Sequence, residues 1–240
     1  MAKLIHTQLE ETGGKFLIKR NQLLLYFLFA FCISACSSSN TGNVAIGYVD
    51  SYKAIRDYLF GSPDLNISRE TIENIPYASM LMRMGNGPQG LLILESKVQE
   101  KYIWVSADDI YIVIKDGKII QTGGFFNNLT KVEASQENVF KEIIETKRSI
   151  SKTFFYTFDN PRLLNLELNA EYSYHGSEKI TILGNEKELI KIEEILRNSY
   201  LGWQVQNYYW IDDDLVVWKS EQHLSPKLPK LSYTLTKKPS

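Results

Sequence analysis

Short apolar runs separated by tight-turn sequences dominate residues 80–122. Met80–Met84 and Gln89–Glu95 flank Gly85-Asn86-Gly87-Pro88, a sequence typical of hairpin turns. Further apolar runs at 102–107, 110–114 and 118–122 are separated by Asp108-Asp109 and Asp116-Gly117. Because turns this short join antiparallel neighbours, the pattern predicts an antiparallel meander of about five strands.

The second half continues the strand pattern with one ambiguous segment. Strands are predicted at 153–158 and 163–174, and a hairpin is predicted from 203–210 to 215–219 around Asp212-Asp213-Asp214. Segment 186–197 is rich in Glu, Lys and Leu, which favours a helix, but its apolar spacing does not settle the period, so helix and strand both stay open. The chain after this hairpin contains three prolines and is predicted to be extended.

Helices are predicted to be few. Apolar positions between Val44 and Phe60 recur mostly every three or four residues, which favours an amphipathic helix that Gly61 and Pro63 end. Residues 68–75 form a helical turn or a loop, and a short helix is expected around 136–147.

The predicted fold class is therefore mainly β, an antiparallel β-sandwich or a barrel-like meander in a single domain, 44–240. Tyr102–Asp108 and Tyr208–Asp214 share the pattern Tyr-x-Trp-aliphatic-x-x-Asp. This repeat suggests two related halves, 44–150 and 151–240. The alternative is convergence, because Trp and Tyr are common in strands.

The N-terminus has the pattern of an export signal. A basic cluster (Lys15, Lys19 and Arg20) precedes an apolar run, 23–33, and small residues follow it. This run is about half the roughly 20 residues that a membrane-spanning helix needs. Residues 1–35 are therefore predicted to be a signal peptide rather than a permanent span.

Ile33-Ser34-Ala35-Cys36 resembles the lipobox of bacterial lipoproteins. The resemblance implies cleavage before Cys36 and lipid attachment to it, with at least two acyl chains, which hold a protein firmly on a membrane. Residues 36–43 then form the lipidated cysteine and a polar, flexible tether. Ser37 stands where Asp commonly retains enterobacterial lipoproteins in the inner membrane, so the outer membrane is favoured, with the protein facing the periplasm.

Charge and cysteine content argue against a nucleic-acid-binding protein and against a fold held by disulfides. Removal of 1–35 takes four of the 27 basic and two of the 28 acidic residues, which leaves a net charge near −3. A nucleic-acid partner is not expected, because it would need a clustered basic excess. Cys32 leaves with the signal peptide, so Cys36 is the single cysteine of the mature chain and no internal disulfide can form.

Catalytic chemistry has little support in the sequence. His175 and His223 are isolated and lack metal-ligand spacing, so neither a metal nor another cofactor is predicted. The carboxylates of 108–109 and 212–214 could form a pair for glycoside hydrolysis. Both groups fall in predicted turns, where Asp is favoured for local backbone bonding, and the turn interpretation is preferred.

Carbohydrate binding is a stronger possibility. Sugar faces stack on aromatic rings, and alternation along strands must place some aromatic residues on the outside. Most large aromatic residues of a β-protein nevertheless belong to its core. The candidates are Trp104, Trp203, Tyr208, Tyr209, Trp210 and Trp218.

Five motifs, in order, resemble the YjbF/GfcB family of lipoproteins. They are Ile75–Ser79, Gly85–Gln89, Trp104–Asp108, Gly117–Gly124 and a C-terminal pair, Asn207–Trp210 with Trp218–Gln222. The resemblance covers roughly Ile46 to Pro239. It implies a mostly β outer-membrane lipoprotein, without established catalytic activity, that serves group 4 capsule or related exopolysaccharide export.

The resemblance leads to a leading hypothesis and two alternatives. The leading one is a non-enzymatic lipoprotein that assists polysaccharide export or assembly by binding the exporter, the glycan or both. The alternatives are a periplasmic enzyme that trims or modifies the polymer and a purely structural envelope lipoprotein. The predicted glycan or partner surface consists of the motif residues Arg83, Gln89, Asp108, Trp210 and Gln222.

Overall fold

Twelve antiparallel strands and two short helices make up the part of the chain that the computed structural model describes, residues 63–133 and 138–239. The helices are α3 (Arg69–Asn74) and α4 (Val139–Thr146). The strands are β1 (Ser79–Met84), β2 (Gln89–Val98), β3 (Lys101–Ser106), β4 (Tyr111–Lys115), β5 (Lys118–Gly123), β6 (Leu129–Glu133), β7 (Ile150–Phe158), β8 (Leu163–Ile182), β9 (Asn185–Asn198), β10 (Trp203–Ile211), β11 (Val217–Gln222) and β12 (Leu231–Lys237).

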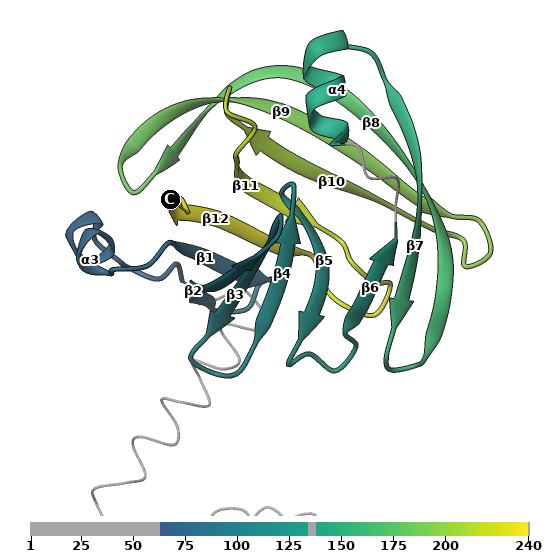
Figure 1. Cartoon of the computed structure of the whole chain (residues 1–240), viewed down its shortest axis with the longest axis horizontal. Coiled ribbons are helices and arrows are strands. Elements are labelled where there is room, and N and C mark those ends of the chain that lie inside the picture. The colour runs from purple at the N-terminus through teal and green to yellow at the C-terminus, as the bar shows by residue number, and fades with distance from the viewer. Residues whose placement is uncertain (1–62, 134–137, 240) are drawn as a thin grey trace, which may run out of the picture. The chain divides into compact units, whose positions relative to one another are not determined.

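A single meander sheet nearly closes into a barrel (Figure 1). Its order is β5-β4-β3-β2-β1-β12-β11-β10-β9-β8-β7-β6, so the last strand pairs with the first. The two edges, β5 and β6, are consecutive in the chain and form no strand pair with each other. A hydrogen bond also links these edges, in which the backbone N–H of Leu129 donates to the Thr122 hydroxyl at 3.0 Å. The barrel-like alternative of the predicted fold class is therefore the one that forms.

The interior of the sheet is one continuous apolar core. Strand β8 shows how alternation builds it, because Leu168, Ala170 and Tyr172 are buried at every second position. Burying one large apolar side chain stabilises the fold by about 1.5–3 kcal/mol. The largest fully buried side chains are Trp104, Tyr156, Tyr172, Tyr209, Phe140 and Phe158.

The meander predicted for residues 80–122 is confirmed as β1–β5. The hairpin around residues 212–214 is confirmed as β10–β11, and the extended C-terminal segment contains β12. Segment 186–197, for which the sequence leaves helix and strand open, is strand β9. Ile192, Glu194 and Leu196 alternate into the interior there, and a register irregularity opposite them in β8 shifts the alternation relative to Leu189.

Both helices have polar N-caps. The Ser68 hydroxyl accepts from the backbone N–H of Thr71 at the start of α3, and the Asn138 side chain accepts from Phe140 and Lys141 at the start of α4. Residues 68–75 thus contain a helical turn, and α4 confirms a helix within 136–147. The N-terminal helix expected at 44–60 lies outside the described residues.

The two related motifs occupy different positions in the sheet. Tyr102–Ser106 lies in β3 and Tyr208–Ile211 in β10, the third strand of the first six and the fourth of the second six. Strands of odd and even rank run in opposite directions in this sheet. Strands β3 and β10 therefore differ both in their rank and in their direction, so the two motifs do not occupy equivalent positions of two related halves.

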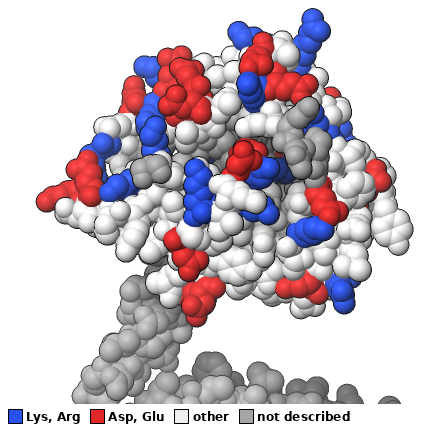
Figure 2. Space-filling view, in the orientation of Figure 1, with Lys and Arg blue, Asp and Glu red and all other residues white. Residues whose placement is uncertain are grey.

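Charges of both signs are interspersed over the face shown in Figure 2. In the described part of the chain, no helix is long and apolar enough to cross a membrane.

Candidate functional site

A cavity of about 300 Å³ lies at the barrel end where the β4–β5 turn, the β10–β11 turn and the C-terminal end of β12 meet. Strands β1, β3, β4 and β12 supply its inner wall, with Met80, Trp104 and Leu235 among the residues. Asp214 and Lys238 also line it, with 78% and 53% of their side chains exposed. The cavity therefore reaches the protein surface between these two residues.

Trp104 gives the cavity wall an unusual feature. It is 2% exposed, and its indole Nε1 has no hydrogen-bond partner among the described residues. Tyr102, two positions earlier on the same face of β3, also lines the cavity. Most buried polar atoms in folded proteins are paired, so this indole N–H is an exception among the described residues.

Carboxylates stand at two turns around the cavity. Asp116 is half-buried in the β4–β5 turn, and burial raises the pKa of its carboxyl, while the charge of Lys115 partly opposes this shift. Asp214 lies in the β10–β11 turn within 3.8 Å of the Lys238 amino group. The cavity mouth therefore combines two acceptors of hydrogen bonds with one cation.

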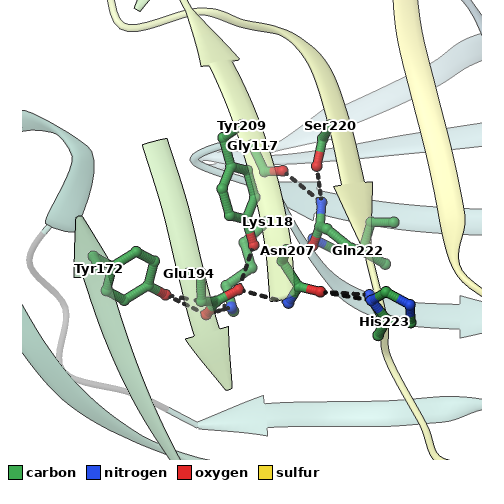
Figure 3. A network of polar contacts seen from close by, with 10 residues as sticks. Gly117, Lys118, Tyr172, Glu194, Asn207, Tyr209, Ser220, Gln222 and His223 are labelled. Atoms are coloured by element: carbon green, nitrogen blue, oxygen red, sulfur yellow. Dashed lines mark hydrogen bonds and ion pairs between the residues drawn. The ribbon is translucent and has the colours of Figure 1, made fainter. Parts of the chain in front are cut away.

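A buried polar network begins next to the cavity, at the start of β5 (Figure 3). Lys118 points into the barrel and forms an ion pair with Glu194 of β9, and their side chains are 10% and 0% exposed. Three further donors complete the carboxylate: Tyr172 at 2.6 Å, Tyr209 at 2.7 Å and Asn207 at 2.8 Å. Strands β5, β8, β9 and β10 thus meet at one buried negative charge.

The surroundings of the pair act on its pKa values in opposing ways. Burial lowers the pKa of the Lys118 amino group, and the Glu194 carboxylate offsets part of this effect. Burial raises the pKa of Glu194, but Lys118 and the hydrogen-bond donors lower it by more, so its net direction is down. Burial and the same carboxylate raise the pKa values of Tyr172 and Tyr209 well above their usual range. The geometry is that of a salt bridge among neutral tyrosines.

Gln222, one of the predicted surface residues, lies inside the barrel with 1% of its surface exposed. Its amide oxygen accepts from the backbone N–H of Ile119 at 3.0 Å, and its amide nitrogen donates to the carbonyl of Gly117 at 3.0 Å. The Tyr233 hydroxyl donates to the same carbonyl at 2.8 Å. Gln222 therefore fastens the start of β5 beside the cavity.

Arg83 and Gln89 are cross-strand partners on β1 and β2. The Arg83 guanidinium forms an ion pair with Asp64, and the Gln89 side-chain oxygen accepts from the backbone N–H of Leu65 at 3.0 Å. The two predicted residues are thus brought together, and they fasten the segment that leads into α3.

Asp108 and Trp210 lie in other parts of the fold. Asp108 is exposed in the β3–β4 turn and accepts from the Ser106 hydroxyl at 2.5 Å. Trp210 is 4% exposed, and the Lys191 and Lys219 amino groups lie 5.3 and 4.3 Å from its ring centroid. The five predicted residues do not form one continuous surface.

The aspartates of the β10–β11 turn behave as turn residues. Asp212 accepts from the backbone N–H of Asp214 at 3.0 Å and of Val216 at 2.9 Å, and from the Trp218 indole at 2.6 Å. The described residues contain no group of three or more His, Cys, Asp or Glu side chains placed to hold a metal ion.

Comparisons with known proteins point to one family. Residues 52–235 match the family described as group 4 capsule polysaccharide lipoprotein GfcB, YjbF. The uncharacterized lipoprotein YjbF of Escherichia coli strain K12 is 26% identical over 226 residues, which cover 92% of this chain and 98% of YjbF. The uncharacterized lipoprotein GfcB of the same strain is 24% identical over 191 residues, which cover 79% of this chain and 85% of GfcB.

A solved structure shares the fold. The crystal structure of the hypothetical lipoprotein YmcC from Escherichia coli K12 superposes with a TM-score of 0.61 at 22% identity, covering 85% of this chain and 99% of YmcC. The family match spans every strand of the described sheet except the last two residues of β12. The chain therefore belongs to the YjbF/GfcB family of group 4 capsule polysaccharide lipoproteins.

Proposed function

We propose that this protein is a non-enzymatic, lipid-anchored protein of the outer membrane that assists export or assembly of a capsular or extracellular polysaccharide. It does so by binding the exporter, the glycan or both. The observation that carries this proposal is the family match across 52–235, which covers nearly the whole β-domain behind the lipobox cysteine.

Attachment at Cys36 is the first part of the proposal. Two or more acyl chains on this residue hold the domain at the membrane, whereas one chain binds only marginally. In a strain that lacks the gene, Cys36→Ser should fail to restore the amount, length and location of surface polysaccharide. Cys32→Ser should restore them, because Cys32 precedes the predicted cleavage site. Surface polysaccharide that is unchanged by deletion of the gene would contradict the proposed role.

Location in the outer membrane is the second part. Ser37→Asp introduces the residue that commonly retains enterobacterial lipoproteins in the inner membrane, so the variant should move to that fraction on a sucrose gradient. Ser39→Asp adds the same charge two residues later and serves as the control. If wild-type protein already sediments with the inner membrane, the outer-membrane assignment is refuted.

Binding without turnover is the third part. The aspartates of residues 212–214 lie in a hairpin turn, where Asp212 bonds the local backbone. The Asp116 and Asp214 carboxylates line a cavity with aromatic walls, an arrangement suited to holding a polar ring-shaped ligand. Purified polysaccharide incubated with the full-length protein should keep its chain length on gel filtration. Shortened chains would instead favour the periplasmic enzyme.

A further inference from the structure

We propose that the cavity at the β4–β5 and β10–β11 turns is a carbohydrate-binding site that takes about one or two sugar rings of the polysaccharide. This inference rests on the proposed function and gives it a place in the fold. The site is separate from the residues Arg83, Gln89 and Trp210, which do not line the cavity.

The size and walls of the cavity suit a sugar ring. Its volume of about 300 Å³ falls at the lower end of ligand pockets, where small ligands bind. Tyr102, Trp104 and Tyr233 line it, and the partly exposed Tyr102 offers ring surface against which the C–H face of a pyranose packs. Purely apolar ligands are disfavoured, because carboxylates and a lysine share the same space.

Polar groups around the cavity match the hydroxyl groups of a sugar. The Asp116 and Asp214 carboxylates accept hydrogen bonds, which sugar hydroxyls donate. The Lys238 amino group, 3.8 Å from Asp214, donates to a hydroxyl or to a ring oxygen. Acceptors and a donor from two turns and the chain end thus surround one small space.

The Trp104 indole forms a buried part of the cavity wall. Its N–H is buried and has no partner within the described residues, although a polar atom in that state is usually paired.

The cavity walls are held in place before a ligand arrives. The carbonyl of Gly117 accepts from Gln222 and from Tyr233, which fixes the turn that carries Asp116. Gly117 lies so close to Val217 that an added Cβ would come within 2.1 Å of its methyl carbon. A preorganised wall reduces the entropy lost on binding, which favours recognition of a weakly binding sugar unit.

The test uses the full-length protein in detergent micelles and short oligosaccharides released by partial acid hydrolysis of the surface polysaccharide from the same cells. Saturation-transfer difference NMR detects binding, and a titration gives Kd. We expect wild-type protein to bind. The double variant Asp116→Asn/Asp214→Asn should bind at least about tenfold more weakly, because hydrogen bonds to charged acceptors exceed those to neutral ones.

The matched control is Asp109→Asn/Asp213→Asn. Asp109 has the same left-handed backbone as Asp116, with φ values of 60° and 50°, and Asp213 is an exposed neighbour of Asp214 in the same turn. Neither control position lines the cavity, so its Kd should equal that of the wild type. The single variant Asp214→Asn, at an exposed side chain, keeps the test decisive should the double variant fail to fold.

Two results would overturn the site. One is the absence of any saturation transfer to the oligosaccharides with wild-type protein, and the other is equal weakening by the cavity and control variants. A failure of the site is distinguishable from a failure of the proposed function. If deletion of the gene alters surface polysaccharide while the protein binds no oligosaccharide, the role in export stands and the cavity assignment falls.

Discussion

The buried ion pair gives a sharp prediction about stability. Lys118→Met leaves the Glu194 carboxylate in the barrel without its cation, and removing one partner of a buried pair costs about 3–5 kcal/mol. The hydrogen bonds from Tyr172, Tyr209 and Asn207 remain, so we expect a loss near the lower end, about 3 kcal/mol. Glu194→Gln should cost more, about 5 kcal/mol, because it leaves Lys118 unpaired and turns an amide NH₂ toward neighbouring donors.

Urea unfolding of the full-length protein, followed by tryptophan fluorescence, measures these losses as changes in the free energy of unfolding. The control is Lys179→Met, which removes one partner of the Lys179–Glu186 pair, whose side chains are 72% and 67% exposed. That change should cost no more than about 1 kcal/mol. If Lys118→Met costs no more than the control, the inferred role of the buried pair is refuted.

Two further predictions concern the turn beside the cavity and the end of β11. Gly117→Ala should lower the free energy of unfolding by about 2–5 kcal/mol, because left-handed backbone strain adds to a clash with Val217. The control Gly184→Ala introduces the same strain in open space and should cost about 1–2 kcal/mol. Equal losses for the two variants in urea titrations would refute the clash. Burial lowers the pKa of His223 in the folded state, so its neutral ring contributes stability that is complete above the unfolded pKa of about 6.5 and is lost as the pH falls through the folded pKa. His223→Gln should flatten this part of the stability profile, and an unchanged slope between about pH 7 and 5 would contradict the assignment.

Hairpins were predictable because their signals are local. Asp116-Gly117 occupies a turn in which both residues have positive φ, 50° and 76°, and these are residue types that tolerate that backbone. Asp212 bonds the backbone of its own turn within four residues. In both cases the chemistry that sets the structure lies inside a few consecutive positions.

Strand β9 was not predictable on the same grounds. Glu194 occupies an inward position, so the apolar alternation that marks a strand is broken by a charged residue. The buried charge of Glu194 is balanced by Lys118, which is 76 positions away in the sequence. No local pattern contains this pairing. The Glu, Lys and Leu content of the segment favours a helix while its apolar spacing does not settle the period, so the sequence leaves helix and strand open.

The cavity was hidden for a related reason. Trp104 was a candidate aromatic residue, but its place on the inner wall depends on which face of β3 turns inward, and Asp116 and Asp214 were explained as turn residues. They are turn residues, and the closure of the sheet also brings their two turns to the same cavity. Proximity of residues about 100 positions apart is a property of the closed sheet and is absent from either turn alone.

The unpaired edge of β5 accounts for the interior position of Gln222. Strand β5 is a sheet edge, so the first backbone groups along it have a strand partner on one side only. An unpaired buried backbone group costs about 1–3 kcal/mol. The Gln222 amide presents one acceptor to Ile119 and one donor to Gly117, which are the groups that a neighbouring strand would offer. A side chain thus replaces the missing strand at the start of β5, directly after the cavity-lining Gly117, and the barrel can remain open at its seam while the candidate site stays ordered.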